Sequence, residues 1–353
     1  MKTVRFGIVG YGFMGYEHYK MLHDFPGAAV TAVCDRLPEQ VADAPEGVKA
    51  YTDADDLFAD PDVDVVILSA NNNQHCSLVC RAAAAGKDII CEKPVAMTLE
   101  ELDIMEEAVK KAGVKFTVHQ QRRFDPDFRT TKNVIESGTL GDVYTVKSSL
   151  YGYNGNVHEW HVYKSEGGGM LYDWGVHLID QILWMTDSKI KSVFADVRNV
   201  FNFEVDDYFK IILKFYSGLT AEIELGTYYL STKPDWFERH WYVAGNKGTA
   251  EIDGFNPKGN IVRTTKLLTE VGKKRATGSG GPTRSFGIPE EGLIVTEPLP
   301  IAQTEHADYF RNYIAAYNGE EEFLVKIDEV RRSLRLIDAV RESAQTGFAV
   351  AFE

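Results

Sequence analysis

A glycine-rich turn lies between an apolar run and a helical pattern close to the N-terminus of this sequence. The run Val4 to Val9 is β-rich, and the segment GYGFMG that follows it places Gly10, Gly12 and Gly15 in a G-x-G-x-x-G pattern. The first glycine of such a turn permits a tight backbone reversal, the second lets a pyrophosphate approach, and the third allows the helix to pack closely on the strand. The turn therefore predicts a dinucleotide-binding βαβ unit that starts at the first strand.

Further β-rich runs alternate with helical patterns as far as residue 119. Since parallel strands that alternate with helices are covered on both faces, this order predicts an α/β domain with a doubly wound parallel sheet. Thr98 with Glu101 predicts a capping box for the last helix of this region, and Gly113 predicts its end. The predicted strands are Val4 to Val9, Ala29 to Cys34, Val48 to Tyr51, Val63 to Ser69, Asp88 to Cys91 and Phe116 to His119.

The pattern changes after Arg122. From Asp142 onward, long stretches of alternating polar and apolar residues predict an antiparallel sheet with one covered face. Helical patterns near Leu171 to Met185 and from about Thr304 to Ala344 complete an α+β domain. We therefore predict two domains, residues 1–122 and 123–353, with C-terminal helices that pack back on the first domain.

The charge balance limits the partners of this protein. Its 38 Lys and Arg against 52 Asp and Glu give a formal net charge of −14, which argues against nucleic acids and anionic membrane surfaces. No apolar run approaches the roughly 18 residues of a membrane span, and the first residues do not resemble a secretory signal. The four cysteines form no zinc pattern. We expect a cytoplasmic protein with reduced thiols and no metal.

An acidic residue ends the second predicted strand. Asp35 follows Gly15 by about 20 residues, where a carboxylate accepts hydrogen bonds from the ribose hydroxyls of adenosine and disfavours a 2′-phosphate. Arg36 leaves an alternative open, because an arginine at this place can pair with a 2′-phosphate. We expect NAD as the cofactor, with NADP as the alternative.

In a doubly wound sheet the ligand lies at the carboxyl ends of the strands near the switch point, here after the first, fourth and fifth strands. The fourth strand is followed by asparagines and His75, and the fifth by Cys-Glu-Lys-Pro. The asparagines have an equally good interpretation as turn caps. The candidate cofactor-binding residues are Gly10, Gly12, Phe13, Met14, Gly15, Asp35, Arg36, Ala70, Asn72, His75, Glu92 and Lys93.

Three residues have the chemistry for oxidising an alcohol. Lys93 follows the fifth strand and would lie near a bound nicotinamide, where an ammonium suits hydrogen bonding to a reacting hydroxyl. Asp173 and His177 are four residues apart on a predicted helix, with Asp180 on the same face, so a carboxylate there can orient an imidazole. We expect Asp173 to orient either this histidine or the lysine. Histidine is the natural base near neutral pH. Three preceding glycines, Gly167 to Gly169, suggest that this helix starts close to another backbone.

Together, the GxGxxG turn, the C-E-K-P segment and the GGGxLxDxGxHxxD segment resemble the Gfo/Idh/MocA oxidoreductases. The resemblance covers nearly the whole chain and extends to AGK before the fifth strand, QRRF at Gln121 to Phe124 and the C-terminal RLIDAVRESAQTG. It implies that Lys93, Asp173 and His177 are the catalytic residues. It also implies an open-faced, mainly antiparallel sheet in the second domain, through which the chain would form a homodimer or homotetramer.

The stretch YGYNGNVHEWHVYK carries aromatic, amide and imidazole side chains, which suit a sugar, cyclitol or related polyol. Arg123 either joins this site or braces the two domains. The candidate substrate-binding residues are Lys93, Arg123, Tyr151, Asn154, His158, Trp160, Asp173 and His177. We expect hydride transfer between the polyol and the nicotinamide. Two other readings stay open: an NAD-dependent glycosidase on the same architecture, and a dinucleotide-binding sensor without catalysis.

Overall fold

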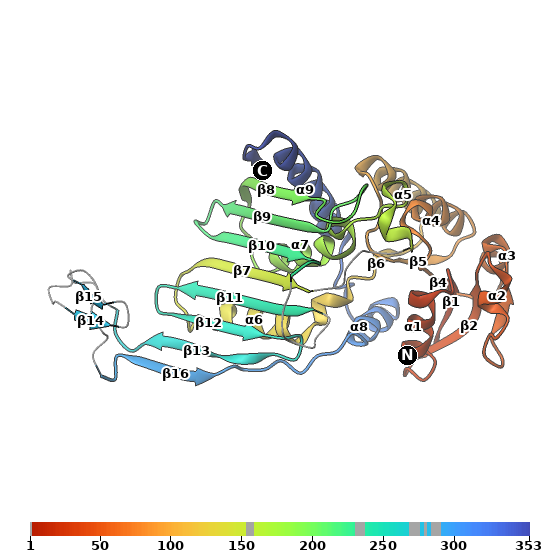
Figure 1. Ribbon diagram of the computed structural model, residues 1–353. Coiled ribbons are helices and arrows are strands. Elements are labelled where there is room, and N and C mark those ends of the chain that lie inside the picture. Colours follow the sequence, from red (N-terminus) through yellow and green to blue (C-terminus); the bar gives the residue numbers. More distant parts are fainter. Residues whose placement is uncertain (1, 153–158, 230–236, 268–275, 279–280, 284–290) are drawn as a thin grey trace.

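The computed structural model describes residues 2–152, 159–229, 237–267, 276–278, 281–283 and 291–353 (Figure 1). Two sheets organise this part of the chain: a parallel sheet built from the N-terminal segment and a larger mixed sheet built from the segment after residue 142. The fold class predicted from the sequence is confirmed.

The first sheet has the strand order β3-β2-β1-β4-β5-β6, and all its strands are parallel. The predicted strands are all present, with ends that shift by at most two residues. The strands are β1 (Val4–Val9), β2 (Ala28–Cys34), β3 (Lys49–Tyr51), β4 (Val65–Leu68), β5 (Asp88–Cys91) and β6 (Phe116–Val118). The helices are α1 (Phe13–Leu22), α2 (Pro38–Val41), α3 (Ala54–Ala59), α4 (His75–Ala84) and α5 (Leu99–Ala112).

Helix α5 begins and ends at the residues that the sequence predicts. The Thr98 hydroxyl accepts a hydrogen bond from Glu101 N at 3.2 Å. The Glu101 carboxylate reaches back one residue beyond the cap, to Met97 N at 2.8 Å, so the reciprocal half of the predicted capping box is displaced. Gly113 ends the helix with a φ of 70°, a conformation that favours glycine.

The second sheet has the order β16-β13-β12-β11-β7-β10-β9-β8-β17, and only the β7–β10 pair is parallel. A separate hairpin pairs β14 (Ala276–Gly278) with β15 (Gly281–Thr283). The sheet strands are β7 (Val143–Tyr151), β8 (Ile190–Arg198), β9 (Tyr208–Phe215), β10 (Thr220–Gly226), β11 (Glu238–Gly245), β12 (Gly248–Asp253), β13 (Lys258–Thr264), β16 (Ile294–Pro298) and β17 (Val350–Ala351). The helices of this region are α6 (Pro126–Glu136), α7 (Val176–Trp184), α8 (Asp308–Tyr317) and α9 (Ile327–Thr346).

One face of the second sheet is covered by α6, α7 and α9, and the other is open (Figure 1). Burial alternates along each strand in agreement with this arrangement. In β9 the side chains of Phe209, Ile211 and Leu213 are fully buried, whereas Lys214 on the open face is exposed. A hydrophobic face turned toward the helices and a mixed face turned away is the arrangement expected for a sheet covered on one side.

The C-terminal helices contact the parallel sheet. Phe310 of α8 packs edge-on against Phe6 of β1, with ring centroids 6.3 Å apart, and Thr117 of β6 donates a hydrogen bond to the carbonyl of Val325 at 2.9 Å. Since the last strand of the parallel sheet ends at Val118 and α6 follows soon after it, we propose a domain junction near residue 122. No helix in the described ranges is long and apolar enough to cross a membrane.

Candidate active site

The three glycines of the first turn are each required for a different reason. Gly10 has a φ of +87°, which disfavours any side chain. A Cβ on Gly15 would lie 2.1 Å from the carbonyl oxygen of Gly10, so the helix packs against the turn itself. A Cβ on Gly12 would meet nothing within 4 Å, so this position faces open space at the start of α1. A diphosphate can therefore approach the backbone at Gly12 and the helix N-terminus, and the turn fits a dinucleotide.

Other candidate cofactor residues gather at the same edge. The turn at Gly10 lies so close to the end of β4 that an added Cβ would be 2.6 Å from Ala70 N. Asp35 follows β2 and accepts a hydrogen bond from Leu37 N at 3.0 Å, and Phe13 is 79% exposed at the start of α1. Since β1 and β4 are neighbours from which the strand order runs in both directions, this edge is the switch point at which such sheets bind ligands.

Two candidate side chains after β4 are hydrogen-bonded to backbone carbonyls. The Asn72 amide is buried and donates to the carbonyl of Gly167 in the second domain at 3.0 Å. His75 is fully buried, with Nδ1 2.9 Å from the carbonyl of Pro94 and Nε2 3.0 Å from that of Ala70. The sequence predicts cofactor contact for both. The Asn72 amide nitrogen and both ring nitrogens of His75 hold the loops in place through backbone carbonyls.

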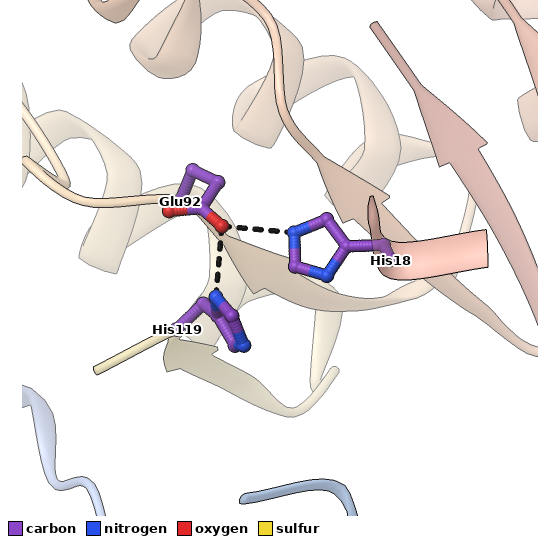
Figure 2. A group of neighbouring side chains, drawn as sticks. All are labelled: His18, Glu92 and His119. Carbon is purple, nitrogen blue, oxygen red and sulfur yellow. Dashed lines mark hydrogen bonds and ion pairs between the residues drawn. The ribbon is translucent and has the colours of Figure 1, made fainter. Parts of the chain in front are cut away.

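Both carboxylate oxygens of Glu92 accept hydrogen bonds within the protein. Its carboxylate is buried and accepts hydrogen bonds from His18 and His119 (Figure 2). The expectation of a direct cofactor contact by this side chain is therefore corrected.

Lys93 and Asp173 meet at the junction of the two domains. The lysine Nζ lies 2.6 Å from Asp173 Oδ1 and 3.0 Å from the Asp173 carbonyl oxygen. Burial raises the pKa of Asp173, but the neighbouring Lys93 and His161 and the Lys93 hydrogen bond outweigh it, so this pKa lies below its usual range. Asp173 is thus an ionised partner for the ammonium.

His177 lies at the start of α7 and takes its partner from the other domain. Its Nδ1 lies 3.1 Å from Gln120 Oε1, an oxygen that only accepts, so Nδ1 carries the proton and Nε2 has a free lone pair. Nε2 has no hydrogen-bond partner among the described residues. Burial, followed by the charges of Lys93 and Arg122, holds the pKa of His177 well below its ordinary value. The imidazole is therefore neutral at neutral pH.

The sequence suggested that Asp173 and Asp180 share one helix face with His177. In the structure Asp173 binds Lys93, the second of the two partners considered for it, and Asp180 binds Arg123. A charged donor satisfies a carboxylate better than a neutral imidazole does, which explains these pairings. Gln120, which the sequence analysis did not single out, orients His177.

The three glycines before this segment allow the close approach that the sequence predicts. A Cβ on Gly168 would lie 2.3 Å from the carbonyl oxygen of His161, and Gly169 N donates to that oxygen at 3.0 Å. This contact brings His161 Nε2 to 3.7 Å from Asp173 Oδ2. Trp160 stacks on His161 with ring centroids 3.7 Å apart. Trp160, a predicted substrate contact, therefore stacks on a histidine that lies near Asp173.

Arg123 is held by contacts within the second predicted domain. Its guanidinium is buried and makes two 2.7 Å hydrogen bonds to Asp180, with further bonds to Glu329 and to the carbonyl of Leu324. All of these partners lie within residues 123–353, so the contacts neither bridge the two predicted domains nor leave the guanidinium available to a substrate. The neighbouring Arg122 lies nearer the site, with its guanidinium 4.0 Å from the ring of Trp174.

Tyr151 lies on the open face of the second sheet. Its hydroxyl donates to Glu224 at 2.9 Å, and its ring stacks on Tyr229 at 4.3 Å. The hydroxyl proton of Tyr151 and one face of its ring are therefore used in contacts within the sheet. Asn154 and His158 lie outside the described residues.

A dinucleotide-type parallel sheet joined to an open-faced mixed sheet, with a lysine, an aspartate and a neutral histidine at the junction, defines an NAD(P)-dependent dehydrogenase that acts on CH–OH groups. Comparison with known proteins gives the family. Residues 4–120 match the oxidoreductase family with an NAD-binding Rossmann fold, and residues 128–251 match the GFO/IDH/MocA C-terminal domain. The chain belongs to the Gfo/Idh/MocA family of oxidoreductases.

Individual relatives agree with this assignment. An NAD-binding protein from Listeria innocua has a solved structure that aligns with a TM-score of 0.85 at 34% identity, over 99% of this chain and 97% of that one. An inositol 2-dehydrogenase of Salmonella paratyphi B is 30% identical over 71% of this chain and 74% of its own length. The scyllo-inositol 2-dehydrogenase (NADP⁺) of Bacillus subtilis is 26% identical over 99% of this chain and 96% of its own length.

Proposed function

We propose that this dehydrogenase oxidises a secondary hydroxyl of a cyclitol or a sugar-like polyol. When bound, the nicotinamide supplies the hydride acceptor. His177 Nε2 takes the hydroxyl proton, Lys93 donates a hydrogen bond to the oxygen that loses it, and Asp173 holds the lysine. Reduction of the ketone uses the same groups in reverse.

The single observation that carries this proposal is the pairing of an ionised Lys93–Asp173 contact with a neutral, buried His177. A hydroxyl oxygen that becomes a carbonyl needs a hydrogen-bond donor, which the ammonium provides. The departing proton needs a base with a free lone pair, which the tautomer fixed by Gln120 provides. Lys93 also lies close enough to lower the pKa of His177, so both groups act on one small region.

Aromatic side chains around this region support a ring-shaped polyol. Trp160 stacked on His161, and Trp174 under the Arg122 guanidinium, place flat apolar surfaces beside polar donors. A cyclitol or a pyranose has apolar C–H faces and a rim of hydroxyls, which such surfaces bind. Two of the relatives are named as inositol dehydrogenases, which supports the same class.

Asp35 supports NAD as the preferred cofactor. Its carboxylate lies at the end of β2, where it would accept hydrogen bonds from the adenosine ribose and repel a 2′-phosphate. Exposed Arg36 beside it supports NADP as the alternative, and one relative is named for NADP.

The experiment that tests the function is an assay of NADH or NADPH formation over a panel of cyclitols, free sugars and nitrophenyl glycosides. We expect reduced cofactor with at least one free polyol, and loss of turnover in Lys93→Met with nearly unchanged NAD affinity. Lys111→Met is the matched control, because Lys111 is exposed on α5. Nitrophenol release without net NADH would instead identify a glycosidase. NAD binding without turnover of any compound would identify a sensor.

We also propose that the chain works as a cytoplasmic homodimer or homotetramer that buries the open face of the second sheet. Exposed Phe194 and half-exposed Val262 on this face support self-association. Light scattering on the eluting protein measures the mass, and Phe194→Asp should weaken the assembly if this face is the contact.

A further inference from the structure

Three buried polar side chains, one of them next to Lys93 in the sequence, meet in the first domain: His18, Glu92 and His119 (Figure 2). His18 Nε2 and His119 Nδ1 each lie 2.8 Å from the same oxygen, Glu92 Oε1. His18 comes from α1, the helix that starts at the glycine-rich turn, Glu92 follows β5, and His119 follows β6. The proposed function uses none of the three.

The hydrogen bonds fix the protonation state of this cluster. Burial raises the pKa of Glu92, but His119 and His18 outweigh it and hold the pKa well below its usual range. Burial lowers the pKa of His119 to about 4, although Glu92 raises it. A carboxylate therefore accepts a hydrogen bond from each ring, which requires a proton on Nε2 of His18 and on Nδ1 of His119.

The remaining ring nitrogens argue against a metal ion in this cluster. His18 Nδ1 and His119 Nε2 are buried and have no hydrogen-bond partner. If the other two nitrogens bound a metal, the protons would move to these buried positions, where ligating histidines almost always have an acceptor. In the hydrogen-bonded cluster these two nitrogens carry no proton, so no buried N–H group lacks an acceptor. The geometry fits a hydrogen-bonded cluster.

The second oxygen of Glu92 reaches the active site. Glu92 Oε2 accepts a hydrogen bond from the backbone N–H of Lys93 at 3.0 Å. The same lysine places its Nζ on Asp173, and the residue after His119 is Gln120, the partner of His177. The cluster thus connects the phosphate-binding helix to both reactive side chains through short, buried contacts.

We propose that Glu92 is a positioning residue for the reaction: held by the N–H groups of His18 and His119, its carboxylate fixes the backbone of Lys93 relative to the helix that binds the cofactor phosphates. This inference rests on the proposed function, because it assigns Glu92 a role through Lys93. A misplacement of about 1 Å at a reacting group costs on the order of a hundredfold in rate, so a positioning role has a measurable effect.

The first test is Glu92→Gln, which keeps the size and shape of the side chain. An amide cannot give one oxygen to both histidines and another to Lys93 N, so we expect kcat to fall roughly 10- to 100-fold. The KM for the polyol and the Kd for NAD should change by less than about threefold, because no binding group is removed. Lys93→Met in the same assay serves as the reference for complete loss of the lysine.

The second test uses the tautomers. The Asn amide nitrogen imitates Nδ1 of histidine, and the Gln amide nitrogen imitates Nε2. His18→Gln and His119→Asn should therefore keep most of kcat, whereas His18→Asn and His119→Gln should lose it. A structural role would depend on side-chain volume alone and would not reverse this order between the two positions.

The outcomes separate the two proposals. If Lys93→Met is inactive but Glu92→Gln turns over at the normal rate, the positioning role is wrong and the proposed function stands. If Lys93→Met is active, the role of Lys93 in the proposed function is wrong, and the positioning role of Glu92 is wrong with it. Should Glu92→Gln not fold, the matched histidine pairs decide the question. A stoichiometric metal found by elemental mass spectrometry, and lost in Glu92→Gln, would overturn the hydrogen-bonded cluster.

Discussion

Asp173 Oδ1 lies 2.6 Å from Lys93 Nζ, across 80 positions of sequence and across the boundary between the two sheets. The aspartate also accepts from this ammonium through its backbone carbonyl. The contact therefore fixes the lysine at two points and leaves His177 to its partner Gln120. The two groups proposed to act on the substrate oxygen and its proton, Lys93 and His177, are therefore oriented by separate partners.

Asp173→Asn should reduce kcat by about 10- to 100-fold, because a hydrogen bond to a charged partner is worth about 1.5–3 kcal/mol and the neutral amide replaces it only partly. NAD affinity should stay within about threefold. Steady-state kinetics with the best polyol measures the first effect, and fluorescence titration with NAD measures the second.

Asp187→Asn is the control for the loss of one negative charge, since Asp187 is exposed beyond α7. Equal losses of kcat in the two variants would mean that net charge, and not the contact with Lys93, is responsible.

Gly12→Ala and Gly15→Ala should separate cofactor binding from stability. A Cβ at Gly12 meets open space, so the variant should keep its melting temperature and lose NAD affinity. A Cβ at Gly15 collides with the Gly10 carbonyl, so that variant should lose at least 1–3 kcal/mol of stability, the usual cost of overpacking. Thermal denaturation without cofactor and NAD titration distinguish them. Unchanged NAD affinity in Gly12→Ala would remove this turn from the cofactor site.

The first domain could be predicted in detail because its signals are local. Apolar runs, glycines and capping residues lie within a few positions of the backbone that they shape, as Thr98 and Gly113 do for α5. The glycine triplet before Asp173 likewise predicted a close backbone approach, which Gly168 makes to His161.

The partners within the site could not be predicted because they are distant in sequence. Asn72 reaches Gly167, Gln120 reaches His177, and His18 reaches Glu92, each over more than 50 positions. Periodicity places a side chain on a face of its own element, but the packing of two domains decides what that face meets. The sequence therefore proposed Lys93, Asp173 and His177 as one site, but it left the partner of Asp173 open and did not predict the contact of His177 with Gln120.

Asp35→Ala should shift cofactor preference toward NADP. Removing the carboxylate takes away an acceptor for the ribose hydroxyls and the repulsion of a 2′-phosphate, while Arg36 stays in place. We expect the ratio of kcat/KM for NADP to that for NAD to rise at least tenfold. Glu39→Ala, at an exposed position of α2, should leave the ratio unchanged. A ratio that does not move in Asp35→Ala would place the adenosine ribose elsewhere.

Arg123→Met should destabilise the protein by about 3–5 kcal/mol, because it leaves Asp180 as an unpaired buried charge. The midpoint of guanidinium denaturation measures the loss. The double variant Arg123→Met/Asp180→Leu should recover most of it, since both charges are then absent. Arg198→Ala, which removes an exposed pair with Asp196, should have little effect. Failure of the double variant to recover would show that Glu329 and the Leu324 carbonyl matter more than Asp180.

His177 should make the protein less stable in acid. Burial lowers its folded-state pKa well below the ordinary value of 6.5. Below pH 6.5 the histidine is therefore protonated in the unfolded chain and still neutral in the folded chain. The stabilising contribution is therefore present above pH 6.5 and is lost as the pH falls, by up to about 1.4 kcal/mol per pH unit. His177→Gln should remove this part of the acid dependence. The measurement is the free energy of unfolding of both proteins from about pH 7 down to about pH 5.

The same ionisation governs the base. Oxidation needs the neutral imidazole, so kcat/KM for the polyol should stay level as the pH falls to 6.5 and decrease only below it. His23→Gln removes an exposed histidine and should change neither profile. A decrease in kcat/KM that begins above pH 6.5 and survives in Gln120→Leu would mean that His177 is not the base. The proton would then leave through another group, and Lys93 would be the first to examine.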